Sequence, residues 1–96
     1  MKLTATTTST SLYDLIDATS WAIAKIESKK IWNEKNWVYW VEIKRKEADI
    51  YVETILDTAT TDSRPVDEWT PVFAFNCQDL HNIYVYWEWD FYISIV

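Results

Sequence analysis

The chain contains no glycine in its 96 residues, and this absence constrains both the turns and the sites that it can build. Average usage would place about seven glycines in a chain of this length. Glycine is needed where a backbone turns with positive φ or approaches a ligand closely, as in dinucleotide fingerprints, phosphate-binding loops, nucleophile elbows and EF-hand loops. Such backbone-built sites are therefore excluded, and any left-handed turn residue must be Asn or Asp.

The length fits one domain whose core needs neither a disulfide nor a metal. The single cysteine, Cys77, cannot form an intrachain disulfide, and with the single histidine, His81, it cannot complete a zinc site. No apolar stretch reaches the roughly 18 residues of a membrane span, and the N-terminus lacks the apolar core of a signal peptide. We expect a cytoplasmic protein with no metal or other cofactor.

Residues 1–10 are rich in threonine and are expected to form an arm, either disordered or paired as an edge strand. A single domain over residues 11–96 follows and begins with a helix, because Ser11 and Asp14 make a capping-box-like start. Apolar residues at three- and four-residue spacing then predict one buried stripe up to about residue 30. The stripe contains Leu12, Leu15, Ile16, Thr19, Ile23 and Ile26, with Ala22 beside it and Trp21 off it.

Alternating apolar and polar residues predict four strands after this helix. They cover residues 37–46, 50–57, 72–75 and 83–96; the first two form a hairpin, and a polar loop over 58–71 precedes the third. The inward positions of the second strand are Ile50, Val52, Thr54 and Leu56, and those of the fourth are Ile83, Val85, Trp87, Trp89, Phe91, Ile93 and Ile95. The pattern predicts an α+β fold in which one N-terminal helix packs on a four-stranded antiparallel sheet, an α-β-β-β-β meander.

The outer face of this sheet is expected to combine aromatic rings with carboxylates. Tyr and Trp favour the centres of interfaces, and a fringe of carboxylates selects a basic partner. Cross-strand aromatic pairs on a half-exposed sheet are the alternative interpretation. However, seven Trp, six Tyr and three Phe exceed what one helix over one sheet can bury. The candidate partner-binding residues are Trp40, Asp49, Tyr51, Glu53, Asp57, Tyr84, Tyr86, Glu88, Asp90 and Tyr92.

Three groupings of residues could carry catalysis, and each has a more ordinary interpretation. His81 with Asp79 is typical of a surface turn, and a Cys77–His81 dyad lacks the third residue that would orient the base. Glu88 and Asp90 lie about 7 Å apart on one strand face, a spacing that overlaps glycosidase carboxylate pairs but also fits a solvated face. We therefore expect a protein that is not an enzyme.

Charge is divided unevenly along the chain. Residues 1–46 hold eight Lys/Arg against five Asp/Glu, whereas residues 47–96 hold Arg64 against ten acids, which together give the net charge of −6. This acidity argues against direct binding of nucleic acid and favours a basic protein as partner. The leading hypothesis is a small protein-binding module, an inhibitor or an immunity or anti-defence protein of the phage or mobile-element type, that blocks a basic nucleic-acid-binding surface, such as that of a nuclease.

In size and in acidic, aromatic composition the chain resembles the immunity proteins of bacterial ribonuclease toxins and small phage anti-CRISPR proteins. This resemblance covers no motif and assigns no residues. Two other classes stay open: a structural or viral protein that self-associates, as in a homodimer, through its C-terminal strand, and a small-ligand or sugar-binding module that uses exposed Trp and Tyr. Light scattering would test the first alternative, and quenching of tryptophan fluorescence by ligand the second.

Overall fold

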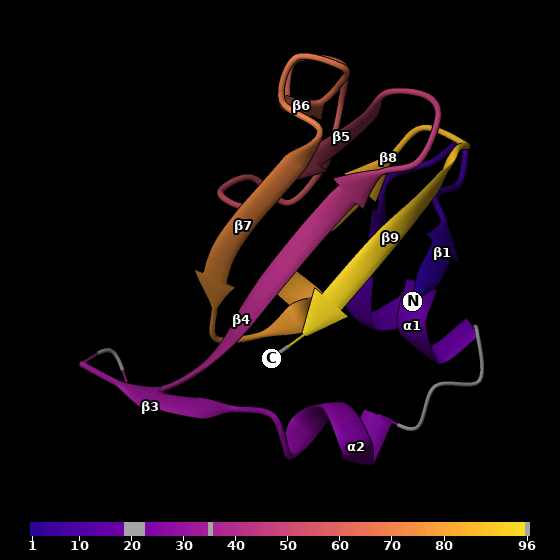
Figure 1. The fold of residues 1–96 in the computed structure, drawn as a ribbon. Coiled ribbons are helices and arrows are strands. Elements are labelled where there is room, and N and C mark those ends of the chain that lie inside the picture. Colours follow the sequence, from indigo (N-terminus) through magenta and orange to yellow (C-terminus); the bar gives the residue numbers. More distant parts are fainter. Residues whose placement is uncertain (19–22, 35, 96) are drawn as a thin grey trace.

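The fold is given by a computed structural model that describes residues 1–18, 23–34 and 36–95. Two antiparallel sheets dominate it, and the helices are short (Figure 1). The larger sheet has the order β1 (Lys2–Thr4), β9 (Asp90–Ile95), β4 (Asn36–Arg45) and β3 (Ile31–Asn33), and β7 (Val72–Cys77) also pairs with β4. The smaller sheet has the order β2 (Thr10–Ser11), β8 (Tyr84–Tyr86), β5 (Ile50–Glu53) and β6 (Arg64–Val66). The predicted single sheet of four strands is therefore wrong.

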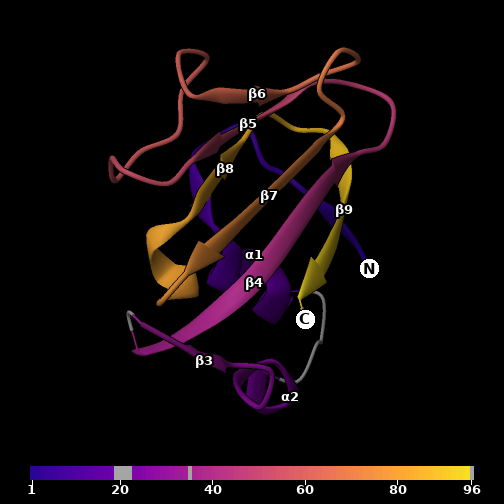
Figure 2. The same ribbon diagram turned by 60° about the vertical axis from the view of Figure 1, so that its left-hand side comes forward.

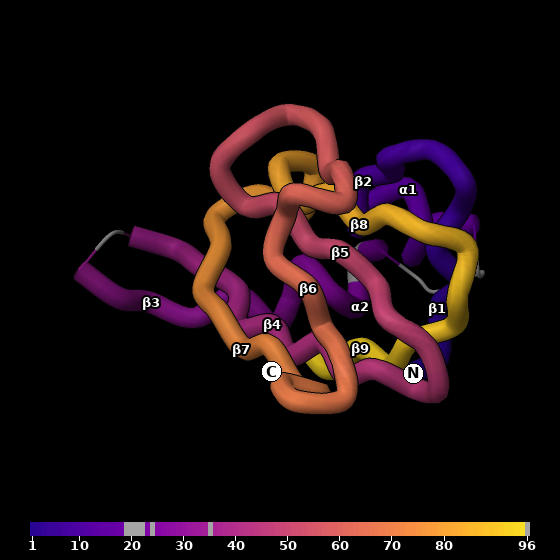
Figure 3. Tube along the Cα trace, turned by 90° about the horizontal axis from the view of Figure 1, so that it is seen from above, coloured from indigo at the N-terminus to yellow at the C-terminus, as the bar shows by residue number. Residues whose placement is uncertain are grey.

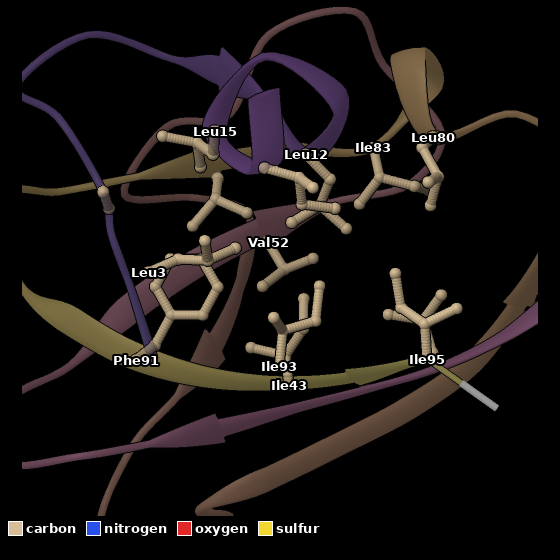
Figure 4. Packing of buried hydrophobic residues seen from close by; sticks show 14 of the residues in the cluster. Leu3, Leu12, Leu15, Ile43, Val52, Leu80, Ile83, Phe91, Ile93 and Ile95 are labelled. Carbon is tan, nitrogen blue, oxygen red and sulfur yellow. The ribbon is translucent and has the colours of Figure 1, made fainter. Parts of the chain in front are cut away.

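The core lies between the two sheets and also receives the apolar face of α1 (Leu12–Ala18) (Figure 4). β4, β5 and β9 contribute every second residue where they face this core, as the period of a strand requires. Burying a Leu, Ile or Phe side chain of this kind contributes about 1.5–3 kcal/mol to folding. The residues buried there include Val41, Ile43, Phe91, Ile93 and Ile95 of the larger sheet, Ile50, Val52 and Val85 of the smaller sheet, and Leu12, Leu15 and Ile16 of α1.

The predicted helix over residues 11–30 is replaced by two shorter helices, α1 and α2 (Ile23–Glu27). Its start is confirmed, because the backbone N–H of Asp14 donates to Ser11 Oγ at 3.2 Å. Thr19, Trp21 and Ala22, whose positions relative to the buried stripe are predicted above, lie outside the described residues. Within the described ranges, no helix is both long and apolar enough to cross a bilayer.

The threonine-rich N-terminal segment pairs with both sheets. β1 pairs with β9, and the backbone groups of Met1 exchange two hydrogen bonds with those of Ile93, at 2.9 and 2.7 Å. β2 then pairs with β8 in the smaller sheet. Of the two alternatives for this segment, the structure therefore has the paired edge strand.

The predicted fourth strand, residues 83–96, is divided between the two sheets. β8 belongs to the smaller sheet and β9 to the larger one, and residues 87–89 connect them. Trp87 has a φ of 97°, and the N–H of Trp89 donates to its carbonyl at 2.6 Å. The predicted burial of these tryptophans is wrong: they are 37% and 41% exposed, because they lie in the connection and not within a sheet.

The predicted hairpin between residues 37–46 and 50–57 is also wrong, because β4 and β5 belong to different sheets. β4 pairs with β7 and β9, and its first residues form a hairpin with β3 that the sequence pattern did not reveal. Asn36 turns this hairpin with a φ of 71°, as expected for Asn. The expectation that Asn or Asp supplies every left-handed residue is wrong, however, because Trp87 also has a positive φ. Seen from above, the β3–β4 hairpin extends away from the rest of the molecule (Figure 3).

Candidate binding surface

Three tyrosines lie together on the outer face of the smaller sheet. In β5 and β8 the neighbouring residues Val52 and Val85 are buried, so Tyr51, Tyr84 and Tyr86 point the other way and are half-buried. Tyr51 is paired with Tyr86 across the two strands, with ring centroids 6.3 Å apart, and the Trp87 ring lies 5.3 Å from that of Tyr86. These four residues are called here the tyrosine face, and the rings of Tyr51, Tyr86 and Trp87 are neighbours in it.

The structure distributes the ten predicted partner-binding residues over both sheets instead of one face. Only the smaller sheet brings several of them together. Tyr51, Glu53, Tyr84 and Tyr86 lie on its strands; Asp57 and Glu88 follow in adjoining loops; Trp40 and Tyr92 lie on the larger sheet; Asp90 begins β9; and Asp49 lies in the link between β4 and β5. The tyrosine face and its adjoining loops are therefore the part of the predicted surface that is spatially coherent.

Glu53 ends β5 and organises the loop that follows. Its Oε2 accepts hydrogen bonds from the backbone N–H groups of Ile55 and Leu56 at 3.1 and 3.2 Å, and its Oε1 accepts one from Ser63 Oγ at 2.9 Å. The backbone donors, Leu56 first, lower the pKa of this carboxyl, so it is ionised at neutral pH. Glu53 thus carries charge but acts first as the anchor of its own loop.

Two other predicted acids also have partners within the molecule. Asp90 accepts a hydrogen bond from Thr4 Oγ1 and lies 3.7 and 3.6 Å from the ammonium groups of Lys2 and Lys46. Asp49 lies 3.3 Å from the guanidinium of Arg45. Asp57 and Glu88 are exposed and have no ion-pair partner among residues 1–18, 23–34 and 36–95. These two are the predicted acids with the most accessible charge.

Residues 53–69, called here the acidic segment, carry five acids against Arg64. The segment contains β6 and the loops on both sides of it, which lie at the end of the molecule opposite α2 (Figure 2). Three of its apolar residues are among the most exposed in the described structure: Ile55 at 89%, Trp69 at 85% and Leu56 at 64%. The predicted inward positions of Thr54 and Leu56 are wrong: both residues are exposed, because β5 ends at Glu53.

Two adjoining hollows open beside this segment and share Thr54 and Asn82 in their linings. The smaller, about 230 Å³, lies between residues 54–57 and Tyr84. The larger, about 460 Å³, is lined by amide and carboxyl side chains together with Val38, Cys77 and Ile83. Its polar side chains come from Asn33, Glu34, Asn76, Gln78, Asp79 and Asn82. Among the described residues neither hollow is lined by Lys or Arg, so both suit a neutral or cationic group.

His81 and Cys77 are placed by the short turn η1 (Leu80–Asn82) and the end of β7. Asp79 Oδ1 lies 2.7 Å from His81 Nδ1, and the imidazole stacks on Tyr13 with ring centroids 3.9 Å apart. Burial raises the pKa of the Cys77 thiol to about 12, which keeps it protonated at neutral pH. The His81 ring is thus held by Asp79 and Tyr13, whereas Cys77 lacks the thiolate that nucleophilic chemistry requires.

The predicted carboxylate pair of Glu88 and Asp90 is divided by the start of β9, and Asp90 is held by Thr4, Lys2 and Lys46. Within the ranges that the structure describes, no three His, Cys, Asp or Glu side chains are grouped to hold a metal ion. The surface that the fold assembles is therefore one of aromatic rings, exposed aliphatic side chains and carboxylates. No family model, curated protein or solved structure matches the chain.

Proposed function

We propose that the protein is a small binding module that occupies a basic, nucleic-acid-binding surface of another protein, as an inhibitor of the immunity or anti-defence type. The observation that carries this proposal is the exposure of Ile55, Leu56 and Trp69 within a segment of five acids and one arginine. Apolar anchors surrounded by carboxylates are what a partner with a cationic surface and apolar pockets would require.

Two carboxylates of this segment, Glu53 and Asp67, are stabilised in their ionised form. Backbone N–H groups, chiefly that of Thr70, lower the pKa of Asp67, much as those of Leu56 and Ile55 lower the pKa of Glu53. Both carboxylates are therefore ionised, and their internal hydrogen bonds shape the loops on which Ile55, Leu56 and Trp69 are displayed. Surface carboxylates of this kind accelerate association with a basic partner and make it sensitive to salt.

The tyrosine face adjoins the acidic segment and extends the proposed contact. Tyrosine gives large, rigid contact area at a low cost in side-chain entropy. Tyr84 and Asp57 both line the smaller hollow, so the face and the segment are contiguous there. Because the chain has one cysteine and can form no intrachain disulfide, we place the protein in a reducing compartment, the cytoplasm.

A small-ligand module is the second candidate, favoured by the larger hollow. Its volume of about 460 Å³ lies in the range of small-molecule sites, and its amides can donate and accept hydrogen bonds. Self-association through the C-terminal strand has less support, because β9 pairs with β1 on one side and with β4 on the other.

Affinity capture with charge-reversal variants tests the proposed function. The pair Asp57→Lys and Glu68→Lys should abolish capture of a nucleic-acid-binding protein from the source cells, identified by mass spectrometry. The pair Asp17→Lys and Glu47→Lys is the matched control, since it changes the net charge equally on exposed residues outside the segment and should retain capture. Equal capture by both pairs, or capture only of proteins without a nucleic-acid-binding surface, would refute the proposal.

A further inference from the structure

The strand β7 forms an edge of the larger sheet, where it pairs with β4 (Figure 1). Pro71 immediately precedes β7 and lies opposite Arg45 in the same register. The N–H of Arg45 donates to the carbonyl of Pro71 at 2.8 Å, so these two residues are a hydrogen-bonded pair. In an antiparallel ladder, hydrogen-bonded and non-hydrogen-bonded pairs alternate. The register therefore directs the backbone groups of Phe73, Phe75 and Cys77 toward β4, and those of Val72, Ala74 and Asn76 toward the open edge.

Three N–H groups and three carbonyls thus face outward from β7, and no described strand pairs with them. Such a row of groups is a template for another strand, and proteins usually protect it with charges, prolines or a short edge. β7 has six residues, Val-Phe-Ala-Phe-Asn-Cys, without a charge or a proline. It is an edge without the usual protection.

The other edge strands of the described structure are protected. β1 and β3 have three residues each and β2 has two, and β1 also carries Lys2. β6 has three residues, of which two are Arg64 and Pro65. The contrast singles out β7 as the edge that is open to a further strand.

We infer that β7 pairs antiparallel with β7 of a second copy of this chain, with Ala74 opposite Ala74. In this register Val72 lies opposite Asn76, so all six outward backbone groups of each strand find a partner. The intervening pairs place Phe73 opposite Phe75 of the second copy. Within one chain these two rings already stack, with centroids 4.9 Å apart, and both are half-buried.

The pairing register is self-complementary in chemistry as well as in hydrogen bonding. No like charges face each other in it, because β7 is uncharged, and the small side chain of Ala74 lies at the two-fold axis. Four phenylalanine rings would meet on the inner side, where aromatic cross-strand pairs stabilise a sheet. Since each chain offers one such edge among its described strands, the assembly closes as a two-fold dimer and does not extend into a fibre.

Analytical ultracentrifugation of the full chain, from micromolar to millimolar concentration, tests this inference with two variants. Ala74→Pro removes an N–H that faces the open edge and so keeps the ladder with β4 intact. Ala74→Thr keeps the N–H and favours a strand. We expect the wild-type chain and Ala74→Thr to form dimers and Ala74→Pro to remain a monomer with an unchanged circular dichroism spectrum.

Hydrogen exchange gives a second measurement that needs no variant. The amides of Val72, Ala74 and Asn76 should become protected as the concentration rises, whereas those of Phe73 and Phe75 should be protected at every concentration. A wild-type chain that remains monomeric, or a dimer in which the three outward amides exchange freely, would overturn the inference. These measurements concern β7 and not the acidic segment. A monomeric chain would therefore overturn the proposed dimer without affecting the proposed function, which the charge-reversal variants test.

Discussion

The backbone N–H of Trp89 donates to the carbonyl of Trp87 at 2.6 Å, and this turn is where the chain passes from the smaller sheet to the larger one. Trp87 enters the turn with a φ of 97°, a conformation that glycine adopts readily and other residues adopt at a cost. In a chain without glycine, a bulky tryptophan takes this position and forms part of the tyrosine face.

We predict that Trp87→Gly is more stable than Trp87→Ala by about 1 kcal/mol, because glycine accepts the positive φ. Truncation of a fully buried tryptophan typically lowers the free energy of unfolding by about 3–5 kcal/mol. Both variants should lose less than this, because Trp87 is 37% exposed. Urea unfolding of the two variants measures the difference. An alanine variant more stable than the glycine variant would contradict the positive φ.

Core and exposed aromatic residues should respond very differently to truncation. Phe91→Ala is expected to cost about 3–5 kcal/mol, because Phe91 is fully buried between the sheets. Trp69→Ala should change the free energy of unfolding by less than about 0.5 kcal/mol, because Trp69 is 85% exposed. Denaturant titration checks both values, and a large destabilisation by Trp69→Ala would mean that its loop packs on the core.

The sequence pattern identified which face of each local segment is buried better than it identified which strands pair. Leu12, Leu15 and Ile16, and likewise Ile50, Val52, Phe91 and Ile93, are buried as predicted, because periodicity records burial directly. Alternation gives no information about the partner strand. The short link between β4 and β5 predicts a hairpin, although β4 belongs to the larger sheet and β5 to the smaller one. The division of residues 83–96 depends on a positive φ at Trp87, and a tryptophan gives no signal of one.

The candidate surface was partly predictable for the same reason. The outward positions of Tyr51, Tyr84 and Tyr86 follow from alternation. The exposure of Ile55 and Leu56 follows from the carboxylate of Glu53, which binds their N–H groups and ends the strand. An acidic side chain can accept hydrogen bonds from backbone N–H groups two or three residues later and so end a strand. Glu53 has this position relative to Ile55 and Leu56, but the apolar alternation that continues to Leu56 predicts a longer strand.

Acid should loosen the loop that Glu53 anchors. The pKa of Glu53 is lowered by backbone hydrogen bonds, so its contribution is complete above about pH 4.3 and is lost as the pH falls through the lowered pKa of the folded state. We expect the amide signals of Ile55 and Leu56 to shift in that acidic range and to exchange faster with solvent. Glu53→Gln should cause faster exchange at neutral pH, whereas Glu88→Gln, the control, should not.

The Cys77 thiol should be unreactive in the folded protein. Burial raises its pKa to about 12, so very little thiolate is present at neutral or mildly alkaline pH. Alkylation by iodoacetamide should be at least about a hundredfold slower than in the urea-unfolded chain. Equal rates in the folded and unfolded chains would show that β7 does not bury this residue.

We propose that the acidic segment, with Ile55, Leu56 and Trp69 exposed on it, binds where a partner holds nucleic acid. The most direct test of this proposal is a competition titration that follows the fluorescence anisotropy of labelled nucleic acid bound to the captured partner. We predict stoichiometric displacement by the wild-type chain and by the Asp17→Lys, Glu47→Lys control. Displacement should weaken as salt is raised, and the Asp57→Lys, Glu68→Lys chain should not displace the nucleic acid. A ternary complex, in which the nucleic acid stays bound while the protein also binds, would contradict the claim.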